Sequence, residues 1–159
     1  MTATAIAGPE GFEARRIGLT LGAGGVDVDS RNDGRPDFGG GGPSLGVVFS
    51  YAYTDRNRVA AEITAAAGEG ETETSSVLSL YGVWSHRFTP EIPGFFVRAG
   101  SGWIQVREGD LSVGGLTVLG GFGYSFSERF SLHTDFTWGG SSDDHYQRGF
   151  FFTGTWWAW

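Results

Sequence analysis

The chain ends in Gly154-Thr155-Trp156-Trp157-Ala158-Trp159, a stretch in which three of six residues are tryptophan. Because side chains alternate across a β-strand, Trp157 and Trp159 are predicted to share one face, with Trp156 on the other. Soluble proteins rarely expose several indoles together, whereas amphipathic aromatic rings favour the boundary between lipid and water. The end of the chain therefore predicts a final strand that meets a membrane.

The composition of the whole chain favours β-structure. Of its 159 residues, 28 are glycine, 15% are aromatic and 18% are charged. Glycine weakens helices, and aromatic residues favour strands. No run approaches the roughly 18 consecutive apolar residues that a membrane helix requires, so any span must be a strand. The net charge of −7 argues against nucleic acid, and the absence of cysteine excludes disulfides and thiolate chemistry.

Alternation of apolar with small or polar residues predicts eight strands of about 11 to 15 residues each. Strands of 9 to 11 residues cross a bilayer when tilted, whereas strands of soluble proteins have about five or six residues. The lengths therefore favour membrane-spanning strands. The predicted segments are residues 15–28, 44–54, 58–68, 75–88, 95–106, 112–126, 130–140 and 147–159.

The connections between these segments alternate in length. Short ones are predicted at 55–57, 89–94 and 127–129, and longer ones at 29–43, 69–74, 107–111 and 141–146. This rhythm is typical of an all-β, eight-stranded antiparallel up-and-down transmembrane β-barrel, with both termini at the end of the short turns. We expect the barrel to form one domain over residues 13–159, preceded by a segment of residues 1–12.

The two faces of the segments differ in bulk. Leu45, Phe49 and Tyr51 share one face, whereas Gly46 and Ser50 share the other. An eight-stranded barrel has room inside only for packed side chains, so the bulky face is predicted to point outward. Alternation alone would also fit a soluble β-sandwich. Aromatic residues near strand ends predict two girdles at the membrane interfaces, formed by Tyr53, Phe95, Trp103, Trp138, Trp157 and Trp159.

Charge is concentrated at the end of the longer connections, where eleven acids and four arginines account for the whole net charge of −7. An acidic rim is therefore predicted, which serves either for solvation or for cation binding, including cations that bridge to lipopolysaccharide. The acids are Asp27, Asp29, Asp33, Asp37, Glu69, Glu71, Glu73, Glu108, Asp110, Asp143 and Asp144, and the arginines are Arg31, Arg35, Arg107 and Arg148.

One part of this rim partly matches a calcium-binding loop. Asp29, Asp33 and Asp37 occupy positions 1, 5 and 9 around a glycine at position 6, as in an EF-hand. Position 3 is an arginine, however, and Gly40 stands at position 12 in place of the bidentate glutamate. Calcium is therefore kept only as an alternative, and no metal site is expected. A flexible acidic loop through the glycine run 39–42 is expected instead.

Four ionisable residues are predicted to meet inside the barrel. Glu62, Arg98, His133 and Asp135 lie on the small-residue face at similar depth. An unpaired buried charge costs several kcal/mol, so we expect a Glu62–Arg98 pair with His133 and Asp135 nearby. The cluster fits a polar core that fills the lumen, an ion path or an acid–base site. Catalysis is not expected, because the residues face away from lipid and no known nucleophile motif accompanies them.

Three stretches carry a resemblance to a known family. They are the ending formed by Gly154, Trp157 and Trp159, the sequence FFVRAGSG at 95–102, and residues 120–126 followed by a Ser-Glu-Arg turn. These resemble the small eight-stranded outer-membrane β-barrels, the family of the OmpA-type transmembrane domain and OmpX, over residues 13–159. The resemblance implies a Gram-negative-type outer membrane, periplasmic termini, extracellular acidic loops, and a C-terminal signal read by the barrel assembly machinery.

The resemblance does not imply one activity, because members of the family have diverse roles. We expect a monomeric integral outer-membrane barrel with a structural or surface-interaction role, in contact with outer-membrane lipids and lipopolysaccharide. No enzymatic activity, cofactor or nucleic-acid partner is expected. Three alternatives remain open: a narrow pore for ions or small solutes, a lipid A-modifying hydrolase, and a soluble ligand-binding barrel.

Overall fold

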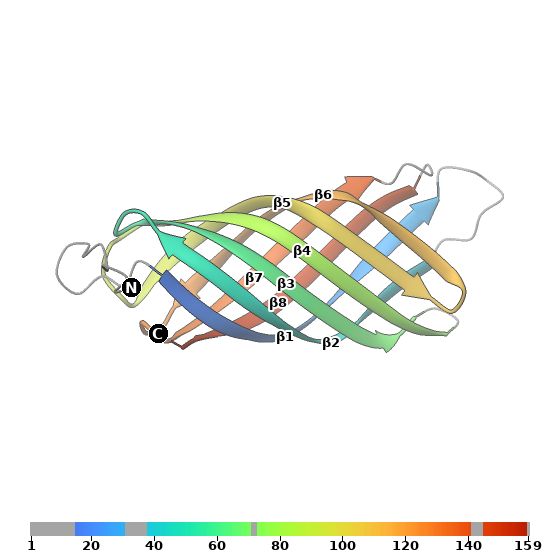
Figure 1. Cartoon of the computed structure of the whole chain (residues 1–159), viewed down its shortest axis with the longest axis horizontal. Coiled ribbons are helices and arrows are strands. Elements are labelled where there is room, and N and C mark those ends of the chain that lie inside the picture. The colour runs from blue at the N-terminus through green and yellow to red at the C-terminus, as the bar shows by residue number, and fades with distance from the viewer. Residues whose placement is uncertain (1–14, 31–37, 71–72, 141–144, 159) are drawn as a thin grey trace, which may run out of the picture.

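The computed structural model describes residues 15–30, 38–70, 73–140 and 145–158. Eight strands form one closed antiparallel barrel in sequence order (Figure 1), which confirms the predicted fold class. None of the described residues forms a helix long and apolar enough to cross a membrane. The strands are β1 (Arg15–Ser30), β2 (Phe38–Ala52), β3 (Asn57–Glu69), β4 (Thr74–Arg87), β5 (Gly94–Glu108), β6 (Leu111–Ser125), β7 (Phe130–Gly140) and β8 (His145–Trp157).

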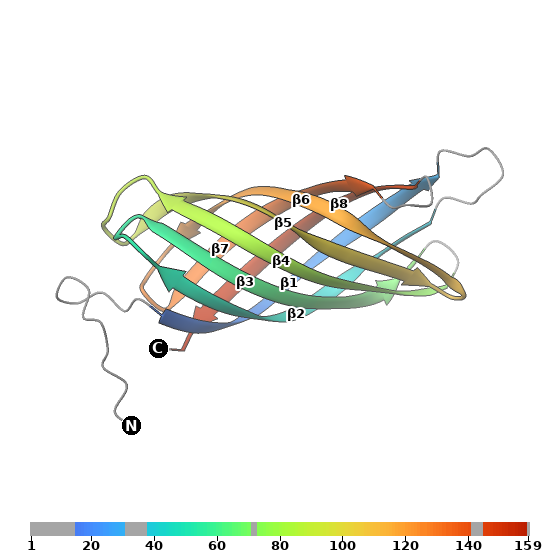
Figure 2. The ribbon, with the colours of Figure 1, turned by 45° about the horizontal axis from the view of Figure 1, so that its top comes forward.

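Closure depends on the pairing of the first strand with the last. The β1–β8 ladder runs from Gly18 opposite Trp157 to Ser30 opposite His145. The strands cross the long axis of the barrel obliquely (Figures 1 and 2), as closure of eight strands requires. β1 begins and β8 ends at the same end of the barrel, which we call the terminal end. The opposite end, where β1 ends and β2 begins, is the loop end.

The strand β2 begins earlier than the sequence indicated. The expectation of a flexible loop through residues 39–42 is wrong, because Phe38 already pairs with Val28, and the glycine run continues the ladder to Gly24 opposite Gly42. Gly42 has a φ of 149°, which residues with a Cβ rarely adopt. The glycine run therefore allows β2 to continue through an irregular position.

The connections at the loop end are not uniformly longer. Only Gly109 and Asp110 separate β5 from β6, which makes this the shortest connection between successive strands. Gly109 has a φ of 54°, in the left-handed region that tight turns often use. Pairing of Glu108 with Leu111 carries both strands to the turn. The expectation of a longer loop at 107–111 is therefore wrong.

The outer surface of the barrel is apolar on all eight strands. Its large hydrophobic side chains are 37% to 72% exposed, and they include Leu45, Phe49 and Leu116. The predicted outward direction of the bulky face is therefore correct for these strands. A soluble monomer rarely exposes an apolar patch larger than a few hundred Å². We call this surface the apolar belt.

Aromatic rings join neighbouring strands at the terminal end of the belt. The ring centroids of Phe95 and Tyr124 lie 4.7 Å apart, and those of Tyr124 and Phe126 lie 4.9 Å apart. The series continues through Phe130 to Trp156, whose centroids are separated by 4.7 Å. Distances of this size are typical of aromatic packing. The series thus links β5, β6, β7 and β8 on the outer face.

The interior has two different halves. Toward the terminal end it contains charged and hydroxyl side chains, as the small and polar inner face predicted. Toward the loop end it is filled by an apolar core, which the sequence analysis did not predict. Branched side chains of moderate volume fill much of the narrow lumen there, and the buried polar side chains of His145 and Gln147 lie in the same half. This apolar core contains Val26, Val28, Phe38, Ala66, Val77, Ile104, Val106 and Val113.

Candidate functional site

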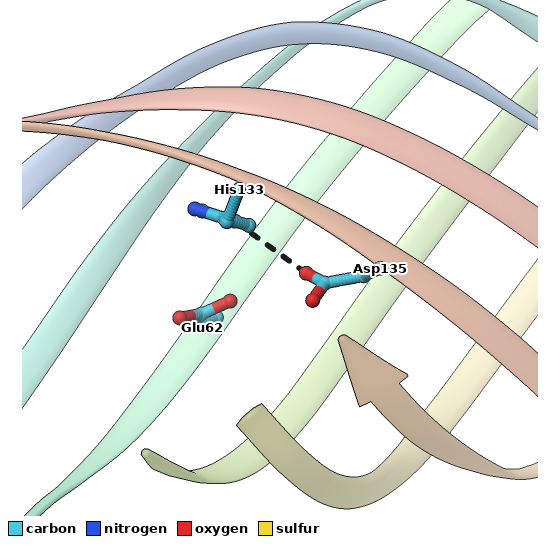
Figure 3. A group of neighbouring side chains, drawn as sticks. All are labelled: Glu62, His133 and Asp135. Carbon is cyan, nitrogen blue, oxygen red and sulfur yellow. Dashed lines mark ion pairs between the residues drawn. The ribbon is translucent and has the colours of Figure 1, made fainter. Parts of the chain in front are cut away.

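The candidate site is the polar cluster in the terminal half of the lumen. Glu62 comes from β3, Arg98 from β5, and His133 and Asp135 from β7. The spacing of two residues places both β7 side chains on the inner face. His133 and Asp135 are each only 4% exposed. Figure 3 shows Glu62, His133 and Asp135 pointing toward one another from their strands. The structure thus brings together the four residues that the sequence analysis singled out.

Arg98 lies between the two carboxylates. Its Nη2 donates a hydrogen bond to Glu62 Oε2 at 2.6 Å, and its Nε lies 3.2 Å from Asp135 Oδ1. On the far side of Asp135, Oδ2 lies 3.4 Å from His133 Nε2. Two carboxylates and one guanidinium leave one negative charge in the cluster when the imidazole is neutral. The arrangement is an ion-pair network in which each charge has an opposite neighbour.

The position of Asp135 depends on a glycine in the neighbouring strand. Gly121 of β6 pairs with Asp135, and a Cβ at this glycine would lie 2.1 Å from Asp135 Oδ1. The contact between Asp135 Oδ1 and Arg98 Nε is an ion pair, and it lacks the alignment of a hydrogen bond. Gly121 thus leaves the space in which the carboxylate approaches Arg98.

The donor set of the cluster resembles that of a metal site, but its centre is occupied by a cation of the protein itself. Atoms of Glu62, His133 and Asp135 that could bind a metal all lie within 4.8 Å of one another. Arg98 contacts both carboxylates, however, and its guanidinium supplies the positive charge that a divalent ion would bring. The geometry therefore fits a charge-compensated network better than a metal centre.

The histidine of the cluster has no hydroxyl nucleophile beside it. Over the described part of the chain, His133 forms no hydrogen bond to a serine or threonine hydroxyl, although Ser131 lies on the same strand and lines the same pocket. A hydroxyl nucleophile needs a base within hydrogen-bond reach. The cluster therefore shows charge pairing without an activated nucleophile.

Different surroundings lie on the two sides of the cluster. On the loop side, the hydroxyl of Tyr81 lies 2.6 Å from Thr117 Oγ1, and the apolar core follows. On the terminal side there is a small open pocket with a cavity volume of about 60 Å³, whose lining includes Glu62, Arg98 and His133. The cluster therefore forms the floor of a pocket that is separated from the loop end by the apolar core.

Comparisons with known proteins identify the fold. No protein-family model matches the chain, and no curated protein matches its sequence. Among solved structures, the chain is similar to Ail, the attachment invasion locus protein of Yersinia pestis, with a TM-score of 0.58 and 12% identity over 92% of this chain and 100% of Ail. The chain has the fold of the small eight-stranded outer-membrane β-barrels.

Two further outer-membrane barrels extend this similarity. Neisserial surface protein A gives a TM-score of 0.58 and 14% identity, covering 88% of this chain and 96% of its own. The outer membrane protein OprG from Pseudomonas aeruginosa gives a TM-score of 0.51 and 11% identity, covering 93% of this chain and 98% of its own. At these identities the similarity concerns the fold.

The barrel carries most of the predicted girdle residues on its outer face. Tyr53, Phe95, Trp103 and Trp138 are all exposed there. Trp84 of β4 joins them, and its Nε1 donates a hydrogen bond to the hydroxyl of Tyr53 at 2.9 Å. These side chains therefore have the outward direction that an interfacial role requires.

The predicted faces of the last strand of the barrel are wrong. Trp156 is 48% exposed on the outer face, whereas Trp157 lines the lumen pocket, with the guanidinium carbon of Arg58 4.9 Å from its ring centroid. Trp156 pairs with the outward Leu19, which sets the direction of both indoles. A shift of one residue exchanges the two faces of a strand. Trp159 lies outside the described residues.

The glycine of the predicted assembly signal lies beneath aromatic rings. Gly154 is on the outward side of β8 but is buried, because the rings of Trp156 and Phe130 cover it. A Cβ at Gly154 would lie 3.3 Å from the Trp156 ring and 3.4 Å from the Phe130 ring. Gly154 therefore provides the space in which the two rings meet.

Two of the predicted acidic sites of the barrel differ from expectation. Asp29 belongs to β1 and forms an ion pair with Arg148 of β8, while Asp33 and Asp37 lie outside the described residues. Glu108 is not part of an exposed rim, because it is 3% exposed. Its carboxylate accepts hydrogen bonds from the backbone N–H groups of Gly39 and Glu73, both at 3.2 Å.

The sequence analysis missed three arginines that enter the lumen at the terminal end. Arg58 lies four residues before Glu62 in β3, and Arg87 ends β4. Both line the same pocket as the polar cluster. Arg16 of β1 lies within electrostatic range of both. The alternation of β3 was the available signal, because Arg58 has the same parity as the inward Glu62.

Proposed function

We propose that the protein is an integral outer-membrane β-barrel with a closed lumen, a structural or surface-interaction role and no enzymatic activity. The observation that carries this proposal is the apolar belt. In the described strands, charged side chains on the outer face lie only near strand ends. Arg15 is at the terminal end, and Asp27, Asp29, Glu69, Arg107 and Arg148 are toward the loop end. Lipid is the solvent that suits a closed belt of this kind, because a barrel leaves no backbone edge unpaired.

Substitution within the belt tests the membrane assignment. Leu80 lies in the middle of β4 on the outer face, and Leu111 lies at the start of β6. An arginine at the bilayer midplane costs about 2 to 4 kcal/mol, and the cost falls to about 0 to 1 near the interface. We expect Leu80→Arg to lower the free energy of unfolding in vesicles by about 2 to 4 kcal/mol, and Leu111→Arg to lower it by about 0 to 1 kcal/mol. Equal effects would contradict the proposal.

A soluble barrel makes a different prediction for the unmodified chain. The membrane assignment requires aggregation in buffer without detergent and heat-modifiable migration in gel electrophoresis after folding into micelles. A monodisperse, folded chain in detergent-free buffer would instead favour the soluble ligand-binding alternative. Light scattering of the refolded chain distinguishes the two outcomes.

The proposed orientation places the terminal end in the periplasm and the loop end outside the cell. The chain has no cysteine, so single cysteines can report accessibility without background. Asp110 is exposed at the loop end, and Glu91 is exposed in the turn between β4 and β5 at the terminal end. We expect a membrane-impermeant maleimide to label Asp110→Cys but not Glu91→Cys on intact cells. The reverse pattern would overturn the orientation.

The loop end is the proposed contact surface. Asp27, Glu69 and Asp110 are exposed there, and an acidic surface attracts cations that also bind lipopolysaccharide phosphates. A surface role is further supported by the name of Ail as an attachment invasion locus protein and by that of neisserial surface protein A. Insertion by the barrel assembly machinery, with Gly154 in its recognition signal, is part of the same proposal.

The contact surface is tested with whole cells or with purified barrel in vesicles. We expect binding to lipopolysaccharide-coated sensors in the presence of millimolar Mg²⁺, with loss of binding on addition of a chelator. The double variant Asp27→Asn with Glu69→Gln is expected to weaken the Mg²⁺-dependent part, because it removes two of the exposed acids. Binding whose strength is the same with and without Mg²⁺, and the same in the double variant, would contradict cation bridging.

A further inference from the structure

A surplus of positive charge lies at the terminal mouth of the lumen. Arg58 and Arg87 line the pocket above the polar cluster, and Arg16 lies within electrostatic range of both. Arg16 has its own partner, because its Nη1 donates a hydrogen bond to the backbone carbonyl of Glu128 at 2.6 Å, and the Glu128 carboxylate lies 4.0 Å away. Arg58 and Arg87 are therefore the two arginines at the mouth for which a binding partner must be sought.

Neither of these arginines has a carboxylate partner among the residues the structure describes. Glu62 and Asp135 are both engaged by Arg98 deeper in the pocket. The exposed turn between β2 and β3 adds Asp55 and Arg56 to the lining, and their charges offset each other. Arg58 and Arg87 add two positive charges, and the polar cluster below them leaves one negative charge, so the net charge of the pocket is about +1. Neither half-buried guanidinium has a carboxylate within ion-pair distance, although Glu128 attracts Arg87 from farther away, and leaving charges unpaired in such surroundings is costly.

The lining of the pocket around these arginines is suited to a polar, anionic ligand. Trp157 forms one wall, and its ring lies 4.9 Å from the guanidinium carbon of Arg58, a cation–π contact that fixes the orientation of Arg58. The hydroxyls of Ser85, Ser131 and Thr155 also line the pocket and supply neutral donors. Guanidinium groups are planar forks that match the paired oxygens of a phosphoryl group.

We propose that the terminal mouth of the lumen binds a soluble phosphate-type oxyanion, such as pyrophosphate or a phosphate monoester, through Arg58 and Arg87. These arginines project into the lumen and not onto the apolar belt, so a free ligand from the aqueous side reaches them and a lipid headgroup held in the bilayer does not. The inference goes beyond the proposed surface role, because it concerns the opposite end of the barrel. Binding of an oxyanion at the terminal end does not depend on whether the loop end binds a partner.

Isothermal titration with pyrophosphate tests the proposal directly. The whole chain is folded in maltoside micelles, because this detergent carries neither charge nor phosphate. We expect one pyrophosphate per barrel, with affinity at least about tenfold lower in Arg58→Gln and in Arg87→Gln. Arg129→Gln is the matched control, because Arg129 is exposed in a turn at the same end and does not line the pocket. It is expected to bind within about twofold of the unmodified chain.

The unfolding temperature provides a second, independent measurement. Without phosphate, Arg87→Gln is expected to unfold at the same temperature as the unmodified barrel or higher, because it removes repulsion between like charges. Pyrophosphate is expected to raise the unfolding temperature of the unmodified barrel and to leave that of Arg87→Gln unchanged, since a ligand stabilises only the state that binds it.

Several outcomes would overturn the proposal. One is the absence of binding at millimolar pyrophosphate, and another is an equal loss of affinity in Arg129→Gln. A third is loss of pyrophosphate binding in nanodiscs when anionic phospholipid replaces zwitterionic lipid, which would identify a headgroup as the ligand.

Discussion

At the scale of single residues, Glu108 shows how a buried acid connects two parts of the loop end. Its carboxylate accepts hydrogen bonds from Gly39 at the start of β2 and from Glu73 in the connection between β3 and β4. Glu108→Ala would leave two backbone N–H groups without this acceptor, at a cost of about 2 to 4 kcal/mol in the free energy of unfolding. Urea titration of the folded barrel in vesicles measures the change.

The comparison variants for this prediction separate charge from hydrogen bonding. Glu108→Gln keeps one acceptor oxygen and is expected to lose less stability than Glu108→Ala. Glu69→Ala removes an exposed acid from the same end and is expected to change the free energy of unfolding by less than about 0.5 kcal/mol. A loss in Glu69→Ala as large as that in Glu108→Ala would contradict the assignment.

Gly154 leads to a second prediction at this scale. The rings of Trp156 and Phe130 occupy the space where a side chain at 154 would lie, so Gly154→Leu must displace them. We expect a loss of about 1 to 3 kcal/mol in unfolding free energy, in the range of overpacking. Gly120→Leu is the matched control, because a Cβ at Gly120 meets nothing within 4 Å. Equal effects at both glycines would contradict the packing role.

At the scale of the strand, the direction of the two indoles of β8 is open to measurement. Trp156 faces outward and Trp157 faces the lumen. In vesicles with brominated acyl chains, Trp156→Phe is therefore expected to reduce the fraction of tryptophan fluorescence that bromine quenches. Trp157→Phe is expected to leave the quenched emission unchanged. The opposite result would restore the direction that the sequence pattern predicted.

The error in β8 shows what alternation does and does not reveal. Long strands with one bulky face, such as β2, were predictable because Leu45, Phe49 and Tyr51 stand in clear contrast to glycine and serine. In β8 both parities carry aromatic residues, since Phe150 and Phe152 face outward while Phe151 is buried in the core. The bulk of the side chain then no longer decides the face. Thr153 and Thr155 were the better signal, because small polar residues suit the inner wall.

The same reasoning separates the predictable part of the site from the rest. The meeting of Glu62, Arg98, His133 and Asp135 was predictable because charges of opposite sign on the inner face of a narrow barrel must pair. The burial of Glu108 was not predictable, because it depends on backbone N–H groups from distant connections. The apolar core was missed for a related reason, since valine and isoleucine at alternate positions do not by themselves specify an inner face.

At the scale of the whole molecule, the apolar core predicts that the barrel does not conduct ions. The pocket at the terminal end stops at the polar cluster, and beyond it branched side chains pack into a buried apolar core. We expect no discrete conductance in a planar bilayer, either for the unmodified barrel or for Arg98→Ala, because that substitution leaves the apolar core in place.

The contrary result is equally informative for this prediction. Discrete current steps that change size in Glu62→Gln or Arg98→Ala would mean that the lumen opens and that the polar cluster gates it. Replacement of Ile104 and Val106 by glycine, which empties part of the apolar core, serves as the positive control for a widened lumen. Steps seen only in that control would support the closed barrel.

The seam between β1 and β8 has a consequence for the order of events during assembly. The first strand of the barrel has no partner on one side until the last strand arrives, and the ion pair of Asp29 with Arg148 lies across that same seam. A chain that stops before His145 would keep two open edges, whose bare peptide groups hydrocarbon does not tolerate. A seven-stranded intermediate is therefore expected to have far less than seven-eighths of the stability of the closed barrel. Completion at the last strand decides whether the other seven persist.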